Sequence, residues 1–572
     1  MRRKIVLALL SFTITLSLSL TQAQIPVMVK DINPGSASSE IWYSPVPAWQ
    51  GIFFFCADDG VTGRELWKSD GTNSGTEMVK DIHPTAGSSC VNFQYVDSIM
   101  YFTATNGLYL DTIYWGQTDS ILYINERRTL WVTDGTDNGT IMIKDVIPAS
   151  NMVSLGGGTF FLAADGLWKT NGTENGTALV KGFTMSQSSE IIVYKNFLFF
   201  AGSVAGYNFE LWTSNGTGAG TELFKTINIF NNSYGSSPQD FIIAGDLLYF
   251  TADNMVYDNT PLPNREVWVT DGTAAGTRIV KDIFPDVGTS SPTLYAVLDD
   301  ILYFTAHDSI YYPGWNYNRE LWKTDGTEDG TIIVKDINYH KPEPLPWGTG
   351  GNANAKEVII MNGDIYLVAN DGAAAGYLWK SDGTTTGTVK IISSDTLVSS
   401  TPSKLISAGY KFYFKAGTGS YGIELWESDG TGAGTKMVAD IYPGSNGGDP
   451  QNMAHINGYL YFTIDNGTEG QELWRIESPT GIDEQAIKEE SLFSIYPNPN
   501  SGRFTISFSS GTSASGSITV TSIFGQVVYN ERFSRIVPGS KRHFNVNELL
   551  AGVYFVSLET EEGSYVRKII IL

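Results

Sequence analysis

The sequence is poor in basic residues, histidine and cysteine, and the shortage of basic residues excludes one class of partner. Against 60 acidic residues there are only 37 lysines and arginines, so the net charge is −23. The isoelectric point calculated from the sequence is about 4.6. A strongly acidic chain repels nucleic acid and anionic lipid surfaces, which excludes nucleic acid as a partner. The charge mainly favours solubility.

Long apolar runs are also missing, with one exception at the N-terminus. Residues 1–23 begin Met-Arg-Arg-Lys, continue through an apolar stretch with Ser and Thr from Ile5 to Leu20, and end Thr-Gln-Ala. This is the pattern of a secretory signal peptide with cleavage between Ala23 and Gln24. An N-terminal membrane anchor is the alternative, but the apolar run is shorter than the usual membrane span. The sequence therefore predicts a secreted protein.

Only two cysteines are present, Cys56 and Cys90. Secretion permits a disulfide, and contact is conceivable because Cys56 falls in a predicted strand and Cys90 at the start of the following repeat unit. The other interpretation, two small buried residues without a bond, is the one that the sequence favours.

What the chain has in abundance is a repeated unit, of which residues 65–82, Glu-Leu-Trp-Lys-Ser-Asp-Gly-Thr-Asn-Ser-Gly-Thr-Glu-Met-Val-Lys-Asp-Ile, are one copy. A Leu-Trp or Val-Trp pair recurs at Trp67, Trp131, Trp168, Trp212, Trp268, Trp322, Trp379, Trp426 and Trp474. In every copy but the last, an Asp or Asn follows three residues after the Trp, and a Gly follows five residues later. Self-similarity at fixed spacing indicates a repeat architecture.

Each unit reads as four short antiparallel strands. The Leu-Trp run and the Val-Lys-Asp-Ile run flank an Asp-Gly turn, which is typical of a β-hairpin. Two further apolar runs precede each Leu-Trp, separated by a turn such as Asn457-Gly458. No stretch of this region has a helical period. Repeated four-stranded units that cannot bury their faces alone predict the blades of a β-propeller.

The two ends of the repeat region complement each other. Val27 to Gly35 is a fourth strand without a Leu-Trp before it, and Glu472 to Arg475 is a third strand without a fourth after it. Their pairing would complete a last blade and leave no free sheet edge. The predicted fold is therefore all-β, a single large propeller of about nine blades over residues 24–476, although propellers usually have about four to eight. Two smaller propellers, or eight blades with one irregular unit, remain open.

After a polar linker at residues 477–490, the pattern changes. From residue 491 to 572 the strands alternate without Leu-Trp, which predicts a small β-sandwich. Its signatures are the Tyr-Pro-Asn-Pro run at 496–499, the Gly-Gln-Val-Val run at 525–528, the Leu-Ala-Gly-Val-Tyr run at 550–554 and the apolar end at 567–572.

In order and spacing these signatures resemble the type A C-terminal sorting domain of the type IX secretion system of Bacteroidota. The resemblance implies that residues 491–572 are an address read by the outer-membrane translocon, commonly cleaved, with the cargo released or attached to the surface through lipopolysaccharide. Residues 25–476 resemble the Glu-Leu-Trp-x-x-Asp-Gly-Thr repeat proteins that often carry this domain, a family that implies no defined activity.

Function is expected on one face of the propeller. The hairpins within each blade that join strands one to two and three to four are short and uniform. All four long insertions belong to the other connections: 106–128, 253–264, 307–318 and 338–356. Long loops on one face of a rigid scaffold usually form a binding surface. They are rich in aromatic residues suited to stacking on sugar rings or anchoring a protein, and the predicted ligand-binding residues are Tyr114, Trp115, Tyr311, Tyr312, Trp315 and Trp347. Folding of these rings onto the blades is the alternative.

The Asp-Gly-Thr turns do not predict a metal site. Each offers one carboxylate, or one amide at Asn171 and Asn215, whereas calcium takes about six to eight oxygens. We expect the side chain to cap its own turn. The Lys-Asp pair of the fourth strand, as in Lys80-Asp81, is interpreted as edge-strand solubility.

No nucleophile elbow, zinc-binding helix motif or phosphate loop appears, so the sequence predicts no catalytic residue and no cofactor. Paired carboxylates among Asp58, Asp59, Asp253 and Asp308 leave a carbohydrate-active enzyme as an alternative. The favoured function is recognition or adhesion: binding of an extracellular glycan or protein. A structural spacer without a ligand is the other alternative.

Overall fold

The structure is a computed structural model of the whole chain. It describes residues 25–478 and 493–571, except for the segments 42–45, 48–50, 108–109, 112–124, 127, 185–189, 204–208, 229–234, 255–263, 285–288, 308–318, 339–352, 373–375, 392–400, 497–499, 501, 509–515, 523–526, 534–539, 547–548, 550–551 and 561–562. The predicted signal peptide with its cleavage site at Ala23 and Gln24, and nearly all of the predicted linker 477–490, lie outside the described residues.

The chain divides into two compact units, Met1–Ser478 and Pro479–Leu572. The described part of the first unit contains nine four-stranded antiparallel sheets, which we call blades 1 to 9 in chain order. We number the four strands of each blade in the order in which they pair, beginning with β2 (Val46–Pro47), the first strand of blade 1. This is the order along the chain in blades 1 to 8, whereas in blade 9 strand four is the N-terminal strand of the propeller. Among the described residues there is no helix, and hence none with the length and apolar character to span a membrane.

Blades 1 to 3 consist of β2 (Val46–Pro47), β3 (Phe53–Asp58), β4 (Arg64–Ser69) and β5 (Glu77–Lys80); β6 (Val91–Val96), β7 (Ile99–Ala104), β10 (Thr129–Thr133) and β11 (Ile141–Lys144); and β12 (Val153–Leu155), β13 (Gly158–Ala163), β14 (Gly166–Thr170) and β15 (Ala178–Gly182). Blades 4 to 6 consist of β16 (Ile191–Tyr194), β17 (Phe197–Gly202), β18 (Glu210–Ser214) and β19 (Thr221–Lys225); β20 (Gln239–Ala244), β21 (Leu247–Asp253), β22 (Arg265–Thr270) and β23 (Arg278–Ile279); and β24 (Thr293–Leu298), β25 (Ile301–His307), β26 (Arg319–Thr324) and β27 (Ile332–Lys335). Blades 7 to 9 consist of β28 (Lys356–Met361), β29 (Asp364–Ala369), β30 (Tyr377–Ser381) and β31 (Val389–Lys390); β32 (Ser403–Ala408), β33 (Lys411–Thr418), β34 (Gly422–Ser428) and β35 (Lys436–Met437); and β36 (Gln451–Ile456), β37 (Tyr459–Asp465), β38 (Gln471–Glu477) and β1 (Val27–Lys30). A small ribbon of β8 (Leu110–Asp111) and β9 (Asn125–Glu126) lies in the insertion of blade 2.

The second strand of each blade is apolar along its length because both faces of the sheet are covered. In β7 every residue from Met100 to Ala104 is buried, and in β25 the same holds from Leu302 to Ala306. A continuous apolar run without alternation is typical of a strand that lies between two layers. Each blade is therefore packed on both sides by its neighbours.

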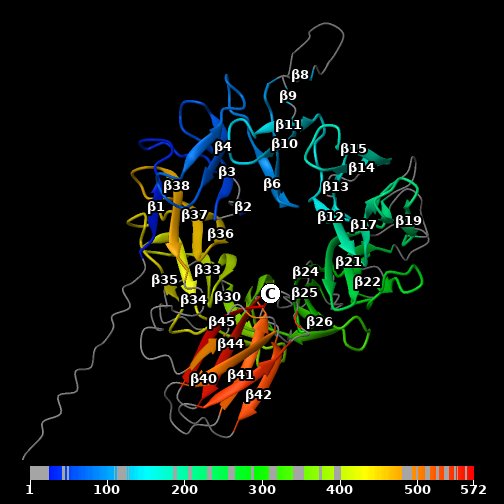
Figure 1. Cartoon of the computed structure of the whole chain (residues 1–572), viewed down its shortest axis with the longest axis vertical. Helices are drawn as coiled ribbons and strands as arrows, with labels where there is room; N and C mark the ends of the chain where they lie inside the picture. Colours follow the sequence, from blue (N-terminus) through cyan, green and yellow to red (C-terminus); the bar gives the residue numbers. More distant parts are fainter. Residues whose placement is uncertain are drawn as a thin grey trace, which may run out of the picture. The chain divides into compact units, whose positions relative to one another are not determined.

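Nine apolar clusters of described residues fill the nine interfaces between consecutive blades. Figure 1 shows the strands of these blades coloured from blue to yellow along the chain. The cluster between blades 1 and 2, for example, joins Phe54 and Leu66 to Met100 and Phe102. Because the last blade also packs on the first, no blade is left with an open face.

The closing interface depends on the N-terminal strand. β1 pairs antiparallel with β38, with Val27 opposite Arg475 and Met28 opposite Trp474. Val29 and Ile32 enter the cluster that joins blade 9 to blade 1. The predicted ring of nine blades, closed by strands from both ends of the repeat region, is confirmed.

The second unit is a small β-sandwich, as expected. One sheet pairs β39 (Phe493–Tyr496), β40 (Arg503–Phe508) and β43 (Lys541–Asn545), and the other pairs β42 (Val527–Phe533), β41 (Gly516–Ser522), β44 (Gly552–Thr560) and β45 (Gly563–Ile571). Their inner faces share one core: Phe504 and Phe544 of the first sheet lie in the same cluster as Ile518 and Val556 of the second.

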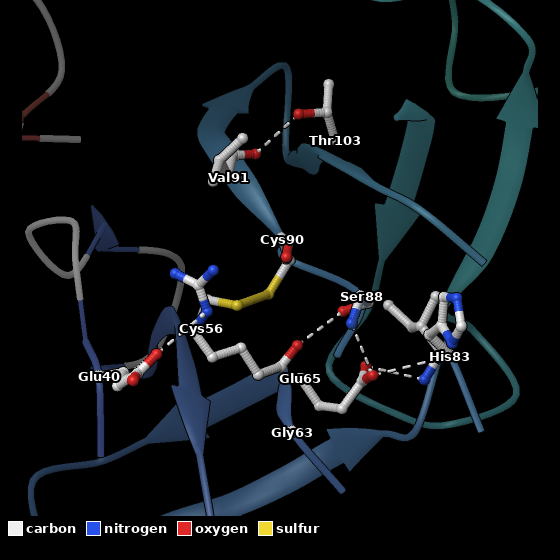
Figure 2. The surroundings of a disulfide bond; sticks show 12 residues. Glu40, Cys56, Gly63, Glu65, His83, Ser88, Cys90, Val91 and Thr103 are labelled. Carbon is white, nitrogen blue, oxygen red and sulfur yellow. Dashed lines mark hydrogen bonds and ion pairs between the residues drawn. A yellow bond between two sulfur atoms is a disulfide. The ribbon is translucent and has the colours of Figure 1, made fainter. Parts of the chain in front are cut away.

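The two cysteines form a disulfide, contrary to the interpretation that the sequence favoured (Figure 2). Cys56 lies in β3 and Cys90 directly before β6, and packing of blade 1 on blade 2 brings their Cα atoms to 5.6 Å. This distance is normal for a disulfide. The bond therefore covalently joins two consecutive blades.

Replacing both cysteines with serine should lower the free energy of unfolding of the propeller by about 3 kcal/mol, because the bond closes a loop with a sequence separation of 34 and so restricts the unfolded chain. Urea unfolding of the oxidised protein and of the C56S/C90S variant, both followed by tryptophan fluorescence, measures the difference. Dithiothreitol should shift the midpoint of the wild type toward that of the variant and leave the variant unchanged. Equal midpoints for wild type and variant would contradict the bond.

Candidate functional site

The six predicted ligand-binding aromatics all lie outside the described residues, but the stems of the insertions that carry them are described. They are Tyr114 and Trp115 in blade 2, Tyr311, Tyr312 and Trp315 in blade 6, and Trp347 between blades 6 and 7. Of the carboxylates considered for catalysis, Asp308 also lies outside. The described part of the candidate site is therefore the base of the insertions, where they join the blades.

Backbone hydrogen bonds assign the insertions to one face. The residue that ends strand two, or in blade 2 the residue directly after it, donates its N–H to a backbone carbonyl in the connection that enters the same blade. These hydrogen bonds join Asp58 to Ser39 (2.7 Å), Thr105 to Ser88 (2.9 Å), Asp253 to Ser236 (2.8 Å) and His307 to Ser290 (2.8 Å). The connections from strand two to three and from strand four to the next blade therefore lie side by side. We call their common side the loop-bearing face.

Two of the aromatic insertions have both of their ends next to β26 of blade 6, although the second insertion leads on to blade 7. His307 and Arg319, which flank the segment 308–318, are paired in the ladder between β25 and β26. The carboxylate of Glu320 accepts a hydrogen bond from Ile337 N (3.1 Å), just before the segment 339–352. Ala355 N donates to the carbonyl of Arg319 (3.1 Å) just after it. Arg319 and Glu320 thus hold both stems at one end of β26, whereas the stem with Tyr114 and Trp115 belongs to blade 2.

A residue of the repeat that the sequence analysis left without a role anchors this face. Six of the nine Leu-Trp or Val-Trp pairs are preceded by glutamate: Glu65, Glu210, Glu266, Glu320, Glu424 and Glu472. All but Glu210 have no solvent exposure. The Glu65 carboxylate accepts hydrogen bonds from the backbone N–H groups of Ile82 (2.9 Å), His83 (3.2 Å) and Ser88 (2.9 Å). Figure 2 shows Glu65 reaching this connection beside the disulfide.

The other glutamates hold the equivalent connections. Glu472 accepts from Ile32 N (2.9 Å) and joins the N-terminal segment to blade 9. Ser236 and Ser290 donate their hydroxyls to Glu210 (2.7 Å) and Glu266 (2.5 Å). A buried carboxylate is stable only when hydrogen bonds satisfy its oxygens. These six side chains, which we call the clamp glutamates, therefore fix where each connection leaves its blade.

Burial is the largest cause of a raised pKa in five of the clamp glutamates. It raises the pKa of Glu65 and Glu210, and it raises that of Glu266, Glu424 and Glu472 to about 7. Hydrogen bonds from backbone N–H groups oppose the shift in each case.

The opposite face has the uniform turns, and there the aspartate caps its own turn as expected. Asp70 Oδ1 accepts hydrogen bonds from Thr72 N (2.8 Å) and Thr72 Oγ1 (2.7 Å), and Thr72 Oγ1 accepts one from Gly75 N (3.0 Å). A Cβ at Gly75 would lie 2.1 Å from Asp70 Oδ1, which explains the second glycine of the motif. The hydrogen bond from Thr72 is the largest cause of the lowered pKa of Asp70.

The same set of bonds recurs in all eight Asp-Gly-Thr or Asn-Gly-Thr turns. Among the described residues, no group of three or more His, Cys, Asp or Glu side chains is placed to hold a metal ion.

The lysine of the Lys-Asp pair does more than make an edge soluble. Lys30, Lys80 and Lys335 donate to backbone carbonyls in the turn of the following blade: Thr76 (2.6 Å), Asp137 (2.9 Å) and Thr388 (2.6 Å). The interpretation as edge-strand solubility is therefore incomplete, because these amines join neighbouring blades.

The described carboxylates that an enzyme would use are engaged locally. Asp58 and Asp59 accept hydrogen bonds from Gly60 N (2.7 Å) and Val61 N (2.9 Å) within their own turn. Asp253, four blades away, forms an ion pair with Arg265 (3.2 Å). These three carboxylates therefore take part in turns and in an ion pair at the base of the loop-bearing face.

Comparison with known proteins assigns the second unit. Residues 494–572 match the family described as the secretion system C-terminal sorting domain. Among curated proteins, none matches the chain.

Several solved peptidase structures resemble part of the chain at low similarity. One of them comes from a structural and mechanistic analysis of two prolyl endopeptidases. It is 12% identical, with a TM-score of 0.35, and the match covers 73% of this chain and 54% of that chain. The β-propeller domain of the Trilobed protease from Pyrococcus furiosus is 12% identical, with a TM-score of 0.31, over 61% of this chain and 97% of that one. The chain thus spans about half the length of the prolyl endopeptidase, 54%, and at these scores the likeness carries no inference about activity.

The fold and the family match together describe a nine-bladed propeller joined to a sorting domain at residues 494–572. The sorting domain is recognised by the type IX secretion machinery, and the protein is exported to the cell surface or the extracellular space.

Proposed function

We propose that the protein is a recognition or adhesion protein that binds an extracellular glycan or a protein ligand through the loop-bearing face. The observation that carries the proposal is that the described ends of two aromatic insertions lie together beside β26 of blade 6. Arg319 and Glu320, adjacent in β26, hold the ends of both aromatic insertions. Tyr311, Tyr312, Trp315 and Trp347 therefore belong to two loops that leave the ring at one place.

Aromatic side chains concentrated in this way are suited to a sugar or a peptide. Their flat faces stack on apolar surfaces, and their polar edges form hydrogen bonds. A few such residues usually carry most of the binding energy of an interface. We also propose Tyr114 and Trp115, which belong to the insertion of blade 2, as ligand-binding residues. Export places the surface where such ligands occur.

We also propose the arrangement of the full chain as a signal peptide at 1–23, the propeller at 24–476, a linker at 477–490 and the sorting domain at 491–572. Cleavage between Ala23 and Gln24 would leave the mature chain to begin three residues before β1, which starts at Val27. Mass spectrometry of the secreted protein tests this boundary.

A glycan array screened with the mature protein tests the proposed function. Changing Trp315 and Trp347 together to alanine should weaken binding at least about tenfold, since interface aromatics of this kind each contribute about 1–2 kcal/mol or more. The matched control is Phe197→Ala, because Phe197 is an aromatic residue, 44% exposed, at a strand one-to-two hairpin on the opposite face.

Equal binding by the double variant and the wild type would remove the site from blade 6. If neither binds any glycan, affinity capture with outer-surface proteins decides between a protein ligand and a spacer without one.

A further inference from the structure

The insertion of blade 2 is held at both of its ends by one dipeptide, Ser88–Ser89. Just before the insertion, the N–H of Thr105 donates to the carbonyl of Ser88 (2.9 Å). At its end, Nε of Arg128 donates to the carbonyl of Ser89 (3.1 Å). The ribbon of β8 and β9 lies between these two points along the chain. The position of Ser88–Ser89 therefore determines where the insertion leaves the blade.

Blades 5 and 6 hold their insertions in the same way, through the dipeptides Ser236–Ser237 and Ser290–Ser291. In each blade a backbone N–H at the end of strand two donates to the first serine, and an arginine at the start of strand three donates to the second. The hydrogen bonds run from Asp253 N to Ser236 O (2.8 Å), from Arg265 Nη2 to Ser237 O (2.8 Å), from His307 N to Ser290 O (2.8 Å) and from Arg319 Nη1 to Ser291 O (2.9 Å). We call these three dipeptides the serine pairs.

Each serine pair has a backbone conformation that needs support. The φ angle of the second serine is +49° in Ser89, +43° in Ser237 and +42° in Ser291. This left-handed region is costly for a residue other than glycine and persists only where the surroundings enforce it. In blades 5 and 6 the next residue is Pro238 or Pro292, and the proline ring restricts the backbone there.

In blade 2 the residue after the serine pair is Cys90, and a disulfide takes the place of the proline restraint. The bond ties Cys90 to Cys56 of blade 1. Glu65 of the same blade supports the serine pair by accepting a hydrogen bond from Ser88 N (2.9 Å). Figure 2 shows Ser88 beside Glu65 and Cys90 joined to Cys56. Among the three serine pairs, this is thus the one whose covalent restraint depends on oxidation.

We propose that the Cys56–Cys90 disulfide is a redox-dependent positioning device for the insertion of blade 2. Without the bond, only hydrogen bonds hold the serine pair, and both ends of the insertion loosen. When the bond forms, each thiol loses its proton, the two Sγ atoms join, and two electrons pass to a disulfide oxidant, which is reduced to two thiols. Disulfides form in oxidising surroundings, so the insertion is fixed after export. The insertions of blades 5 and 6, which proline restrains, do not respond.

Hydrogen exchange of the mature protein, followed by mass spectrometry, tests the device. Exchange in peptides that contain Ser88, Ser89 and Thr105 is compared after treatment with oxidised glutathione and with dithiothreitol. In the reduced form these amides should exchange about tenfold faster, because a local restraint on an opening segment is lost. The amides of Ser290 and His307 form the equivalent hydrogen bonds in blade 6. They are the internal control and should keep their rates.

Variants separate the bond from the cysteines themselves. C56S/C90S should show the faster exchange under both conditions. C56S/C90P, which has a proline where blades 5 and 6 have theirs, should regain the slow exchange and be insensitive to dithiothreitol. The matched control for a general loss of stability is Leu425→Ala, because Leu425 is fully buried in blade 8. It should leave the exchange of the blade 2 amides unchanged.

Equal exchange in the oxidised and the reduced protein would overturn the proposal, and so would a proline variant that exchanges as fast as the serine variant. Alkylation of free thiols, read in the same spectra, verifies that the bond is open in the reduced sample. If the serine variant does not fold, the comparison of oxidised and reduced wild type decides.

The consequence for binding rests on the proposed function and is measured separately. A ligand found on the glycan array should bind the reduced protein at least about threefold more weakly, because ordering a loose loop on binding costs free energy. C56S/C90P should bind like the oxidised wild type. Unchanged affinity together with the expected hydrogen exchange would contradict the role of Tyr114 and Trp115 in binding and would support the device itself.

Discussion

Replacing Val29 with aspartate should prevent the propeller from closing and lower its free energy of unfolding by at least about 5 kcal/mol. Val29 is 4% exposed and packs with Ile32, Phe53 and Trp67 in the cluster that joins blade 9 to blade 1. The change removes a buried apolar side chain, worth about 1.5–3 kcal/mol, and adds an unpaired buried charge, which costs about 3–5 kcal/mol more. Urea unfolding followed by tryptophan fluorescence measures the loss.

The same strand offers the control. Val27 is 49% exposed, so Val27→Asp introduces the same charge without burying it and should change the unfolding free energy by less than about 0.5 kcal/mol. If the two variants were equally stable, β1 would not close the ring, and the pairing of Val27 to Lys30 with β38 would be wrong.

The fold was predictable because every repeat unit contains four strands, so an incomplete unit at either end of the repeat region can be recognised from the sequence. The first segment of the repeat region is a fourth strand without a blade, and the last segment is a third strand without a fourth. The sequence therefore predicts that the two pair, and β1 does pair with β38. The disulfide was not predictable in the same way. Cys56 and Cys90 belong to different units, and only the packing of β3 against the segment before β6 brings them to 5.6 Å between Cα atoms.

The anchoring residues of the loop-bearing face were in the repeat but could not be interpreted from it. In a strand that exposes one face to solvent, the glutamate before Leu-Trp is expected to point into the solvent. Here both faces of each sheet are covered, so Glu65 and Glu472 are buried and turn to the next connection. Six recurrences of glutamate at one position were the available signal. The role of Lys30, Lys80 and Lys335 was also not predictable. Their hydrogen bonds to the following blade depend on how the blades pack in the ring, which the spacing of residues in the sequence does not reveal.

The two faces of the ring therefore differ in what they tolerate. On one face each turn is closed by its own Asp, Thr and Gly, and the approach of Asp70 to Gly75 leaves no room for variation. On the other face the clamp glutamate holds only a few residues near the two ends of the connection, as Glu65 does at Ile82 and Ser88. Insertions can grow beyond Asn338 or His307 without disturbing the blades, and that is where the chain carries its long aromatic segments.

Replacing Trp426 with alanine should lower the free energy of unfolding by about 5 kcal/mol, at the upper end of the range for large-to-small core substitutions. Trp426 is 1% exposed and is among the largest fully buried side chains. Its ring stacks on Phe414 with 6.2 Å between centroids. Its Nε1 donates to the carbonyl of Ala416 at 3.0 Å. The substitution leaves a cavity between blades 7 and 8 and removes this buried hydrogen bond, and both costs add.

Tyr421, in the turn between β33 and β34, separates this packing effect from a general sensitivity of blade 8. It is 40% exposed, so Tyr421→Ala should cost less than about 0.5 kcal/mol. The tryptophan is the most regular residue of the repeat, and this comparison decides why. A large loss at Trp426 alone means that the motif is kept for packing between blades. If Trp426→Ala cost no more than Tyr421→Ala, the motif tryptophans would not hold the blades together.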